Sequence, residues 1–192
     1  VEYIPAYLCS DMTNLNTISI PTTIKGIGDY ALSGTGFYND DSNWENDVLY
    51  VDNCLIRAKK TLSGDYTIKN GTRLIAGSAF WLCQELTSVT IPNSVMNIGA
   101  HAFEGCSGLT FLTSEAMTPP TLRSYAFNSV NYNIPIYVPC ECVSAYKAAS
   151  GWKDFTNIQE NPAKYSIAVN SQNSEMGLTE VEKNTLCGAK IS

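Results

Sequence analysis

The chain reads Ile75-Ala-Gly-Ser-Ala-Phe-Trp-Leu-Cys83, and 23 residues later it reads Ile98-Gly-Ala-His-Ala-Phe-Glu-Gly-Cys106. A fixed period of this length is typical of stacked repeats, because one such unit cannot bury its apolar face alone. The sequence therefore predicts a repeat solenoid. Its recurring apolar and small residues are expected to form a shared core and not a reactive site.

The same pattern recurs near the N-terminus, where Leu15-x-x-Ile-x-Ile-Pro21 matches Leu86-x-x-Val-x-Ile-Pro92 position for position. The alternation predicts a short strand with one buried face, and the proline ends it because it has no N–H to donate. The spacing of Ala102, Phe103 and Cys106 predicts a brief helical turn that packs inward. Each unit is thus expected to contain a short strand, a tight turn and a short helical turn.

This pattern resembles the BspA-like leucine-rich repeat family of bacterial surface proteins. The resemblance is carried by Ile98-Gly-x-x-Ala-Phe-x-x-Cys106 and by Leu86-Thr-Ser-Val-Thr-Ile-Pro92. The run Thr118-Pro-Pro-Thr-Leu122 and the later Gly151-Trp-Lys-Asp-Phe155 are similar to the endings of such arrays in gut Bacteroides-type proteins. The resemblance implies a β-rich leucine-rich-repeat solenoid, a secreted or cell-surface location and binding of other macromolecules. It implies no catalytic residues.

The expected organisation is a solenoid over residues 1–160, with an insertion hairpin at 35–62 and a cap at 115–158. The hairpin is predicted because two apolar runs flank the dipeptide Asp52-Asn53. Residues 161–192 are similar to the start of a divergent InlB-type B-repeat, a small β domain of bacterial surface proteins. They are expected to be a truncated β-rich unit, in which residues 164–192 either form an extra hairpin packed on the cap or are poorly ordered.

Composition excludes two kinds of partner. The 192 residues carry a formal net charge of −6, whereas nucleic-acid binding needs a basic stripe against the phosphates. No apolar run reaches the length of a membrane span. Of the seven cysteines, Cys83 and Cys106 hold equivalent repeat positions, and a buried cysteine behaves as a small hydrophobe. We therefore expect reduced core thiols and no complete disulfide framework.

The residues that could carry chemistry are few and scattered. His101 is the only histidine, and it holds the repeat position of Ser78, so we expect an exposed turn residue without an acid–base role. Cys140 and Cys142 lack the two further ligands that a zinc site needs. The acidic stretch 39–47 does not follow the spacing of a calcium loop. No catalytic residue, metal or cofactor is expected.

Outward-facing strand positions are the candidate ligand-binding surface. Two columns are predicted along the sheet: Thr17, Asp65, Ser88 and Phe111 in one, and Ser19, Thr67, Thr90 and Thr113 in the next. Such residues suit either a solvated strand face or a polar recognition face, on which Phe111 would anchor a partner. Tyr38 and Trp44 in the inserted loop are a second candidate, unless these rings cover the flank of the disturbed repeat.

The sequence therefore predicts a non-catalytic binding or adhesion module that recognises a host or bacterial surface protein or a glycan. One alternative is a structural spacer that presents other domains. Another is an accessory glycan-binding module with Tyr38 and Trp44 as stacking platforms. The unit interrupted at Ile4 predicts an uncapped strand edge at the N-terminal end, and thus weak self-association.

Overall fold

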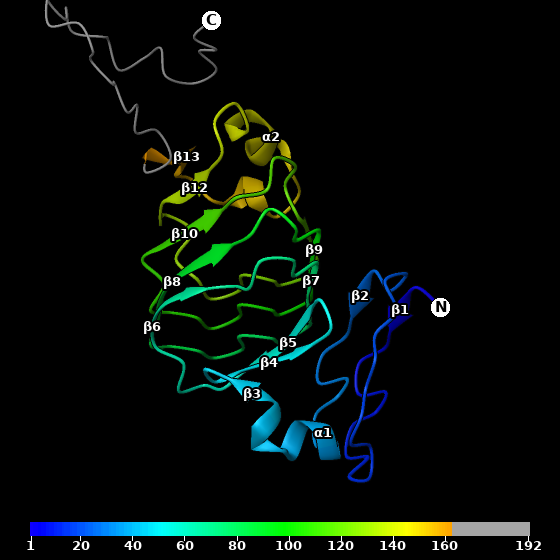
Figure 1. Ribbon diagram of the computed structural model, residues 1–192. Coiled ribbons are helices and arrows are strands. Elements are labelled where there is room, and N and C mark those ends of the chain that lie inside the picture. The colour runs from blue at the N-terminus through cyan, green and yellow to red at the C-terminus, as the bar shows by residue number, and fades with distance from the viewer. Residues whose placement is uncertain (163–192) are drawn as a thin grey trace, which may run out of the picture.

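The computed structural model describes residues 1–162, which are rich in strands and poor in helices (Figure 1). One sheet has the order β13-β12-β10-β8-β6, and all of its neighbouring strands are parallel. Its strands are β6 (Gly64–Thr67), β8 (Leu86–Ile91), β10 (Phe111–Ser114), β12 (Ile136–Val138) and β13 (Ile158–Glu160). The other large sheet has the order β11-β9-β7-β5-β4-β3. Its strands are β3 (Trp44–Glu45), β4 (Val48–Val51), β5 (Cys54–Ala58), β7 (Leu74–Ile75), β9 (Asn97–Ile98) and β11 (Thr121–Leu122).

The 23-residue period sets the register of both sheets. In the five-stranded sheet Thr67 pairs with Thr90, and Thr90 pairs with Thr113. In the six-stranded sheet Ile75 pairs with Ile98. Strands of successive repeats therefore lie one above another (Figure 1). The parallel pairing and the constant offset fit a β-rich repeat fold.

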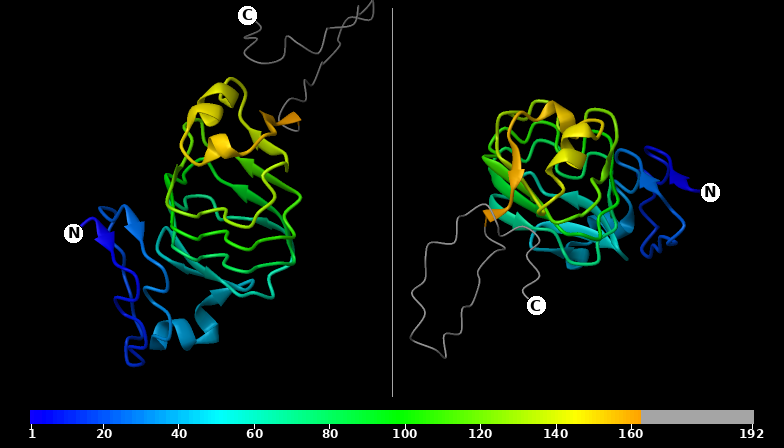
Figure 2. Two further views of the ribbon diagram at one scale, coloured as in Figure 1. Left: turned by 180° about the vertical axis from the view of Figure 1, so that it is seen from behind. Right: turned by 90° about the horizontal axis from the view of Figure 1, so that it is seen from above.

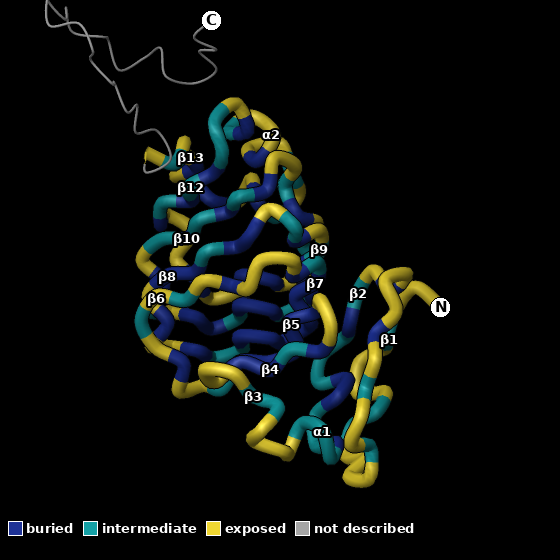
Figure 3. The backbone as a smooth tube through the Cα atoms, viewed as in Figure 1, coloured by how far each residue is buried: buried dark blue, intermediate teal, exposed yellow. Residues whose placement is uncertain are grey.

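A column of phenylalanines runs through the core between the two sheets. The rings of Phe80 and Phe103 stack with centroids 4.8 Å apart, and those of Phe103 and Phe127 stack at 5.0 Å. Cys83 and Cys106 are buried beside them as free thiols. Burial raises the pKa of the Cys83 thiol to about 11, so it stays protonated at neutral pH. The expectation of reduced core thiols at these two positions is confirmed, and Figure 3 shows the buried backbone concentrated in this part of the chain.

The turns between the sheets are not helical, contrary to the expectation. Equivalent residues adopt the left-handed conformation in each turn, such as His101 (φ 55°) and, four residues later, Gly105 (φ 72°). These two reversals point the backbone groups between them toward the neighbouring repeats. The Phe103 N–H, for example, donates to the Ala126 carbonyl at 2.7 Å. The turn keeps single-turn bonds such as the one from the Glu104 N–H to the His101 carbonyl, and the bonds between repeats alternate with them in place of a continuous helix.

The first two repeats, residues 1–34, lie beside the rest of the chain and not beneath it, as Figure 1 and Figure 2 show. Their strands β1 (Tyr3–Ile4) and β2 (Gly26–Ile27) form a separate parallel pair. The Gly77 N–H joins them to the six-stranded sheet by donating to the Ile27 carbonyl at 2.8 Å. A side chain at Gly77 would not fit, because its Cβ would lie 2.7 Å from the Asp29 nitrogen.

The inserted segment explains this sideways placement. After α1 (Gly36–Asn39) and the 3-10 turn η1 (Asp41–Asn43), β4 and β5 form an antiparallel hairpin around Asp52 and Asn53. β5 then pairs in parallel with β7. Strand β5 of the hairpin thus pairs with the edge of β7 that β2 of the second repeat would otherwise occupy.

One predicted alignment is therefore wrong. Thr17 and Ser19 do not extend the columns of the five-stranded sheet, because that sheet ends at β6 and residues 13–20 form no strand. Instead the Asp52 carboxylate, at the tip of the hairpin, accepts hydrogen bonds from the Ile20 N–H and the Ser19 hydroxyl. Residues 15–21 therefore repeat the sequence pattern of β8, but their contact with the hairpin places them outside the five-stranded sheet.

The C-terminal end of the described chain closes over the phenylalanine column. Helix α2 (Val143–Ala148) supplies the buried Tyr146, and the 3-10 turn η2 (Trp152–Asp154) supplies the buried Trp152. The Trp152 indole N–H donates to the Pro120 carbonyl at 2.8 Å. The start of a B-repeat expected over residues 161–192 lies, from residue 163 onward, outside the described residues.

Candidate binding surfaces

The outer face of the five-stranded sheet brings together most of the predicted binding residues. Asp65, Ser88 and Phe111 are cross-strand partners on β6, β8 and β10, in the predicted order. The neighbouring column contains Thr67, Thr90 and Thr113, and the pairing of Thr113 with Tyr137 and of Tyr137 with Gln159 extends it across β12 and β13.

The β6 end of this face is occupied by internal hydrogen bonds. The Asp65 carboxylate accepts from the Ser88 hydroxyl at 2.7 Å and from the Thr87 hydroxyl at 2.9 Å. These bonds hold the pKa of the Asp65 carboxyl below its usual range, because they stabilise the charged form. Ser88 is itself only 4% exposed. At this end the hydroxyls of Ser88 and Thr87 are therefore used within the protein, and the exposed residues of β6 are Asp65 and Thr67.

The β10–β12 part of the face is hollowed and aromatic. The rings of Phe111 and Tyr137 meet edge to face, with centroids 5.9 Å apart. They border a hollow of about 450 Å³ together with Thr90, Thr113, Glu115, Asn161 and Pro162. Tyr137 was not a predicted site residue, and the signal that could have found it is its position 24 residues after Thr113. The structure thus supplies an aromatic pair where the sequence indicated a single ring.

The inserted loop forms a second surface, separate from the first. The Trp44 indole N–H donates to the Tyr38 carbonyl at 2.8 Å, and the two rings meet edge to face at 5.2 Å. Both side chains are half-buried and pack against the core of the N-terminal repeats. They also line a hollow of about 390 Å³ with Asn39, Asp41, Arg57, Ala58, Lys59 and Lys60. The two rings therefore cover the side of the repeat that the inserted segment interrupts, and they also line a hollow on the surface.

His101 is not the exposed turn residue that was expected. Its side chain is 33% exposed, its ring stacks on Tyr125 with centroids 5.5 Å apart, and Nδ1 lies 3.0 Å from the Asp29 carboxylate. The Ser78 hydroxyl donates to the same carboxylate at 2.9 Å. Because serine and histidine both bond Asp29 and not each other, the three groups lack the serine–histidine bond that activates a nucleophile. They join the N-terminal repeats to the rest of the chain.

The described residues show no further constellation of reactive groups. Within residues 1–162, no group of three or more His, Cys, Asp and Glu side chains is placed to hold a metal ion. Cys140 is disulfide-bonded, so it does not form a pair of free thiolates with Cys142. None of the helices in the same residues has the length and apolar character needed to cross a membrane.

Comparison with known families identifies the repeat. A model described as a BspA type leucine rich repeat region matches the chain in six copies, over residues 1–110 and 54–149. No curated protein matches the chain.

Proposed function

Because the chain belongs to the BspA-type leucine-rich repeat family, we propose that it is a non-catalytic binding module of a bacterial cell-surface or secreted protein. Membership of this family suggests a repeat protein of the cell surface. We take the repeats to form a solenoid whose five-stranded sheet presents the ligand-binding face. The ligand is a protein or glycan of the host or of another bacterial surface.

The observation that supports this proposal best is the aromatic pair of Phe111 and Tyr137 in its hollow. Neither ring is buried, and both stand on strands whose opposite faces pack into the core. Rigidly held aromatic rings lose little conformational freedom on binding and are frequent among the residues that dominate binding energy. The volume of about 450 Å³ lies in the range of small-ligand and side-chain pockets. A ligand can therefore bury these rings without any rearrangement of the sheet.

The test is binding of the purified chain to an array of host matrix proteins and glycans at physiological salt, repeated with Phe111→Ala. Loss of a central aromatic anchor is expected to weaken binding about 30-fold, corresponding to about 2 kcal/mol. Tyr125→Ala is the matched control, because Tyr125 is 67% exposed and lies on a turn outside this sheet. Equal binding by wild type and Phe111→Ala would contradict the proposed face. A blank array with folded protein would favour the spacer alternative.

The end of the first repeat supports the proposed weak self-association. Tyr7, Leu8 and Met12 are exposed by 61%, 53% and 51%, and they lie close together in the chain. Their neighbouring strand β1 has β2 as its partner. An apolar surface beside a strand with a single partner is a ready site for pairing with a second copy of the chain.

A further inference from the structure

Basic and aromatic side chains gather at the junction between the inserted segment and the N-terminal repeats, away from the five-stranded sheet. Arg57, Lys59 and Lys60 supply three of the twelve Lys and Arg residues of a chain whose formal net charge is −6. All three line the hollow of about 390 Å³ beside Tyr38 and Trp44. We call these five residues, together with Trp81, the basic junction.

Arg57 is the central residue of the basic junction, and it is a buried cation. It is 9% exposed, and its guanidinium donates to the Ser78 carbonyl. The ring centroids of Tyr30 and Trp81 lie 4.9 Å and 5.9 Å from its central carbon. None of the ion pairs within residues 1–162 includes Arg57. Because a buried charge is stabilised best by an opposite charge, the guanidinium keeps an unused capacity to bind an anion.

Lys60 provides a second uncompensated charge. Its ammonium lies 4.3 Å from the centroid of Trp81, the same indole that flanks Arg57. Lys59 differs, since its ammonium is 3.0 Å from Asp41 and 3.9 Å from Asp47. Asp41 and Asp47 are thus paired with Lys59, while Arg57 and Lys60 have no carboxylate partner among residues 1–162.

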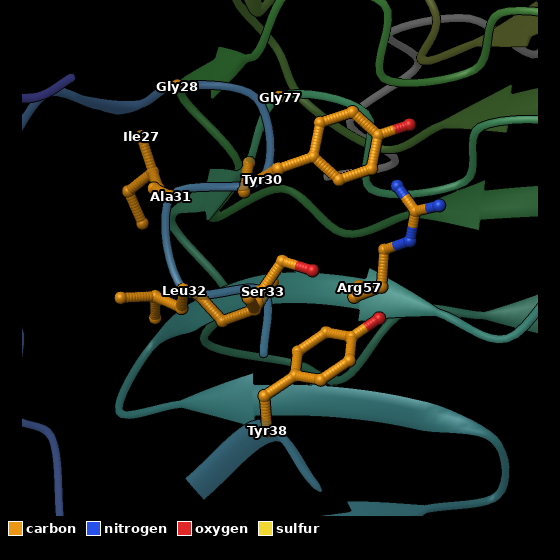
Figure 4. Close-up of a pocket in the computed structure, with 11 residues that line it drawn as sticks. Ile27, Gly28, Tyr30, Ala31, Leu32, Ser33, Tyr38, Arg57 and Gly77 are labelled. Atoms are coloured by element: carbon orange, nitrogen blue, oxygen red, sulfur yellow. The ribbon is translucent and has the colours of Figure 1, made fainter. Parts of the chain in front are cut away.

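The shape of the basic junction narrows the class of anion. Figure 4 shows a smaller neighbouring pocket that shares Tyr38 and Arg57 with the hollow, and in it the Arg57 guanidinium and the hydroxyls of Tyr30 and Tyr38 are turned toward the same side. A planar guanidinium binds carboxylate or sulfate through two parallel hydrogen bonds. The aromatic rings offer flat apolar faces, which match the C–H face of a pyranose ring, and the polar Asn39 and Asp41 line the hollow beside them. The hollow is large enough for a small ligand of this kind.

We propose that the basic junction binds an acidic sugar, with its carboxylate or sulfate on Arg57 and Lys60 and its ring against the aromatic side chains. This site does not depend on the proposed function of the five-stranded sheet.

The test is isothermal titration of the whole chain with three probes: sialyllactose, lactose sulfate and neutral lactose. We expect one or both acidic probes to bind and neutral lactose to bind at least tenfold more weakly, because a charge-assisted hydrogen bond is lost. Binding of only one acidic probe assigns the group as carboxylate or sulfate. A tri-glutamate peptide that binds as tightly as the better sugar would overturn the assignment to a sugar.

Two variants locate the site. Lys60→Ala is expected to weaken acidic-sugar binding about fivefold and Arg57→Lys about tenfold, because lysine cannot form the two parallel bonds. Lys60 is exposed, so its variant remains informative even if Arg57→Lys fails to fold. Lys153→Ala, an exposed lysine on η2, is the matched control, and Phe111→Ala should leave this binding unchanged. Absent binding, equal binding of lactose, or binding indifferent to Lys60→Ala would overturn the proposal.

Discussion

Replacing Phe103 with alanine should remove the central ring of the phenylalanine column. Phe103 is 0% exposed, and its ring contacts Phe80 on one side and Phe127 on the other. A buried phenylalanine replaced by alanine costs about 3–5 kcal/mol through lost transfer energy and the cavity left behind. The substitution also removes two ring contacts, each worth about 1 kcal/mol beyond burial. Its cost is therefore expected at the upper end of that range. We expect the free energy of unfolding to fall by about 5 kcal/mol.

Urea denaturation followed by far-UV circular dichroism measures this loss. Phe103→Leu keeps most of the buried volume but removes both ring contacts, so its expected cost is about 2 kcal/mol. Met96→Ala, at a side chain that is 62% exposed, should change stability by no more than about 0.5 kcal/mol. The reasoning is refuted if Phe103→Ala costs less than about 2 kcal/mol, or if leucine costs as much as alanine.

Three further predictions concern other parts of the chain. Gly99→Ala should cost more than about 3 kcal/mol in urea denaturation, because its Cβ would lie 2.3 Å from the Gly77 nitrogen. Gly71→Ala, with φ +85° but nothing within 4 Å, should cost only about 1–2 kcal/mol, and equal losses would show that close packing is not the cause. Burial raises the pKa of Cys83 from 9.0 to about 11, so the thiol ionises first in the unfolded chain and stability is lost as the pH rises from 9 toward 11. Unfolding at pH 8 and pH 10.5 should therefore differ less in Cys83→Ala than in wild type, and an unchanged difference would exclude this thiol as a source. Leu8→Ser should reduce self-association in sedimentation velocity, and a wild-type chain that stays monomeric at all concentrations would remove the basis for the N-terminal contact.

The period predicted the pairing within the five-stranded sheet, since Asp65, Ser88 and Phe111 recur at 23-residue intervals and meet in the structure. Thr17 belongs to the same pattern but lies elsewhere. A repeat pattern shows which residues occupy equivalent positions in their units. It does not show whether the strands of those units belong to the same sheet. That choice depends on β5, which competes with β2 for the edge of β7. This competition involves strands that are distant in the sequence, so no local sequence pattern indicates which of them pairs with β7.

The site contacts that were missed have two causes. Tyr137 lies beyond the best-matched repeats, where the interval becomes 24 residues. Arg57 stands in an apolar strand, and only the sideways placement of Tyr30 reveals that its guanidinium is buried against a ring. His101 likewise meets Asp29 across 72 residues. The contacts of Arg57 with Tyr30 and of His101 with Asp29 join units that are not neighbours in the sequence, so the period could not indicate them.

The bond from Asp29 to both Ser78 and His101 limits how the number of repeats can change during evolution. Asp29 spans two consecutive repeats, because one carboxylate oxygen accepts from Ser78 and the other faces His101. A unit inserted between those two residues with a different side chain at the position of His101 would break this contact. A unit gained or lost beyond Gly105 would leave it intact. The number of units can therefore change on the C-terminal side of His101 without loss of this contact, whereas a unit inserted at the junction must supply its own partner for Asp29.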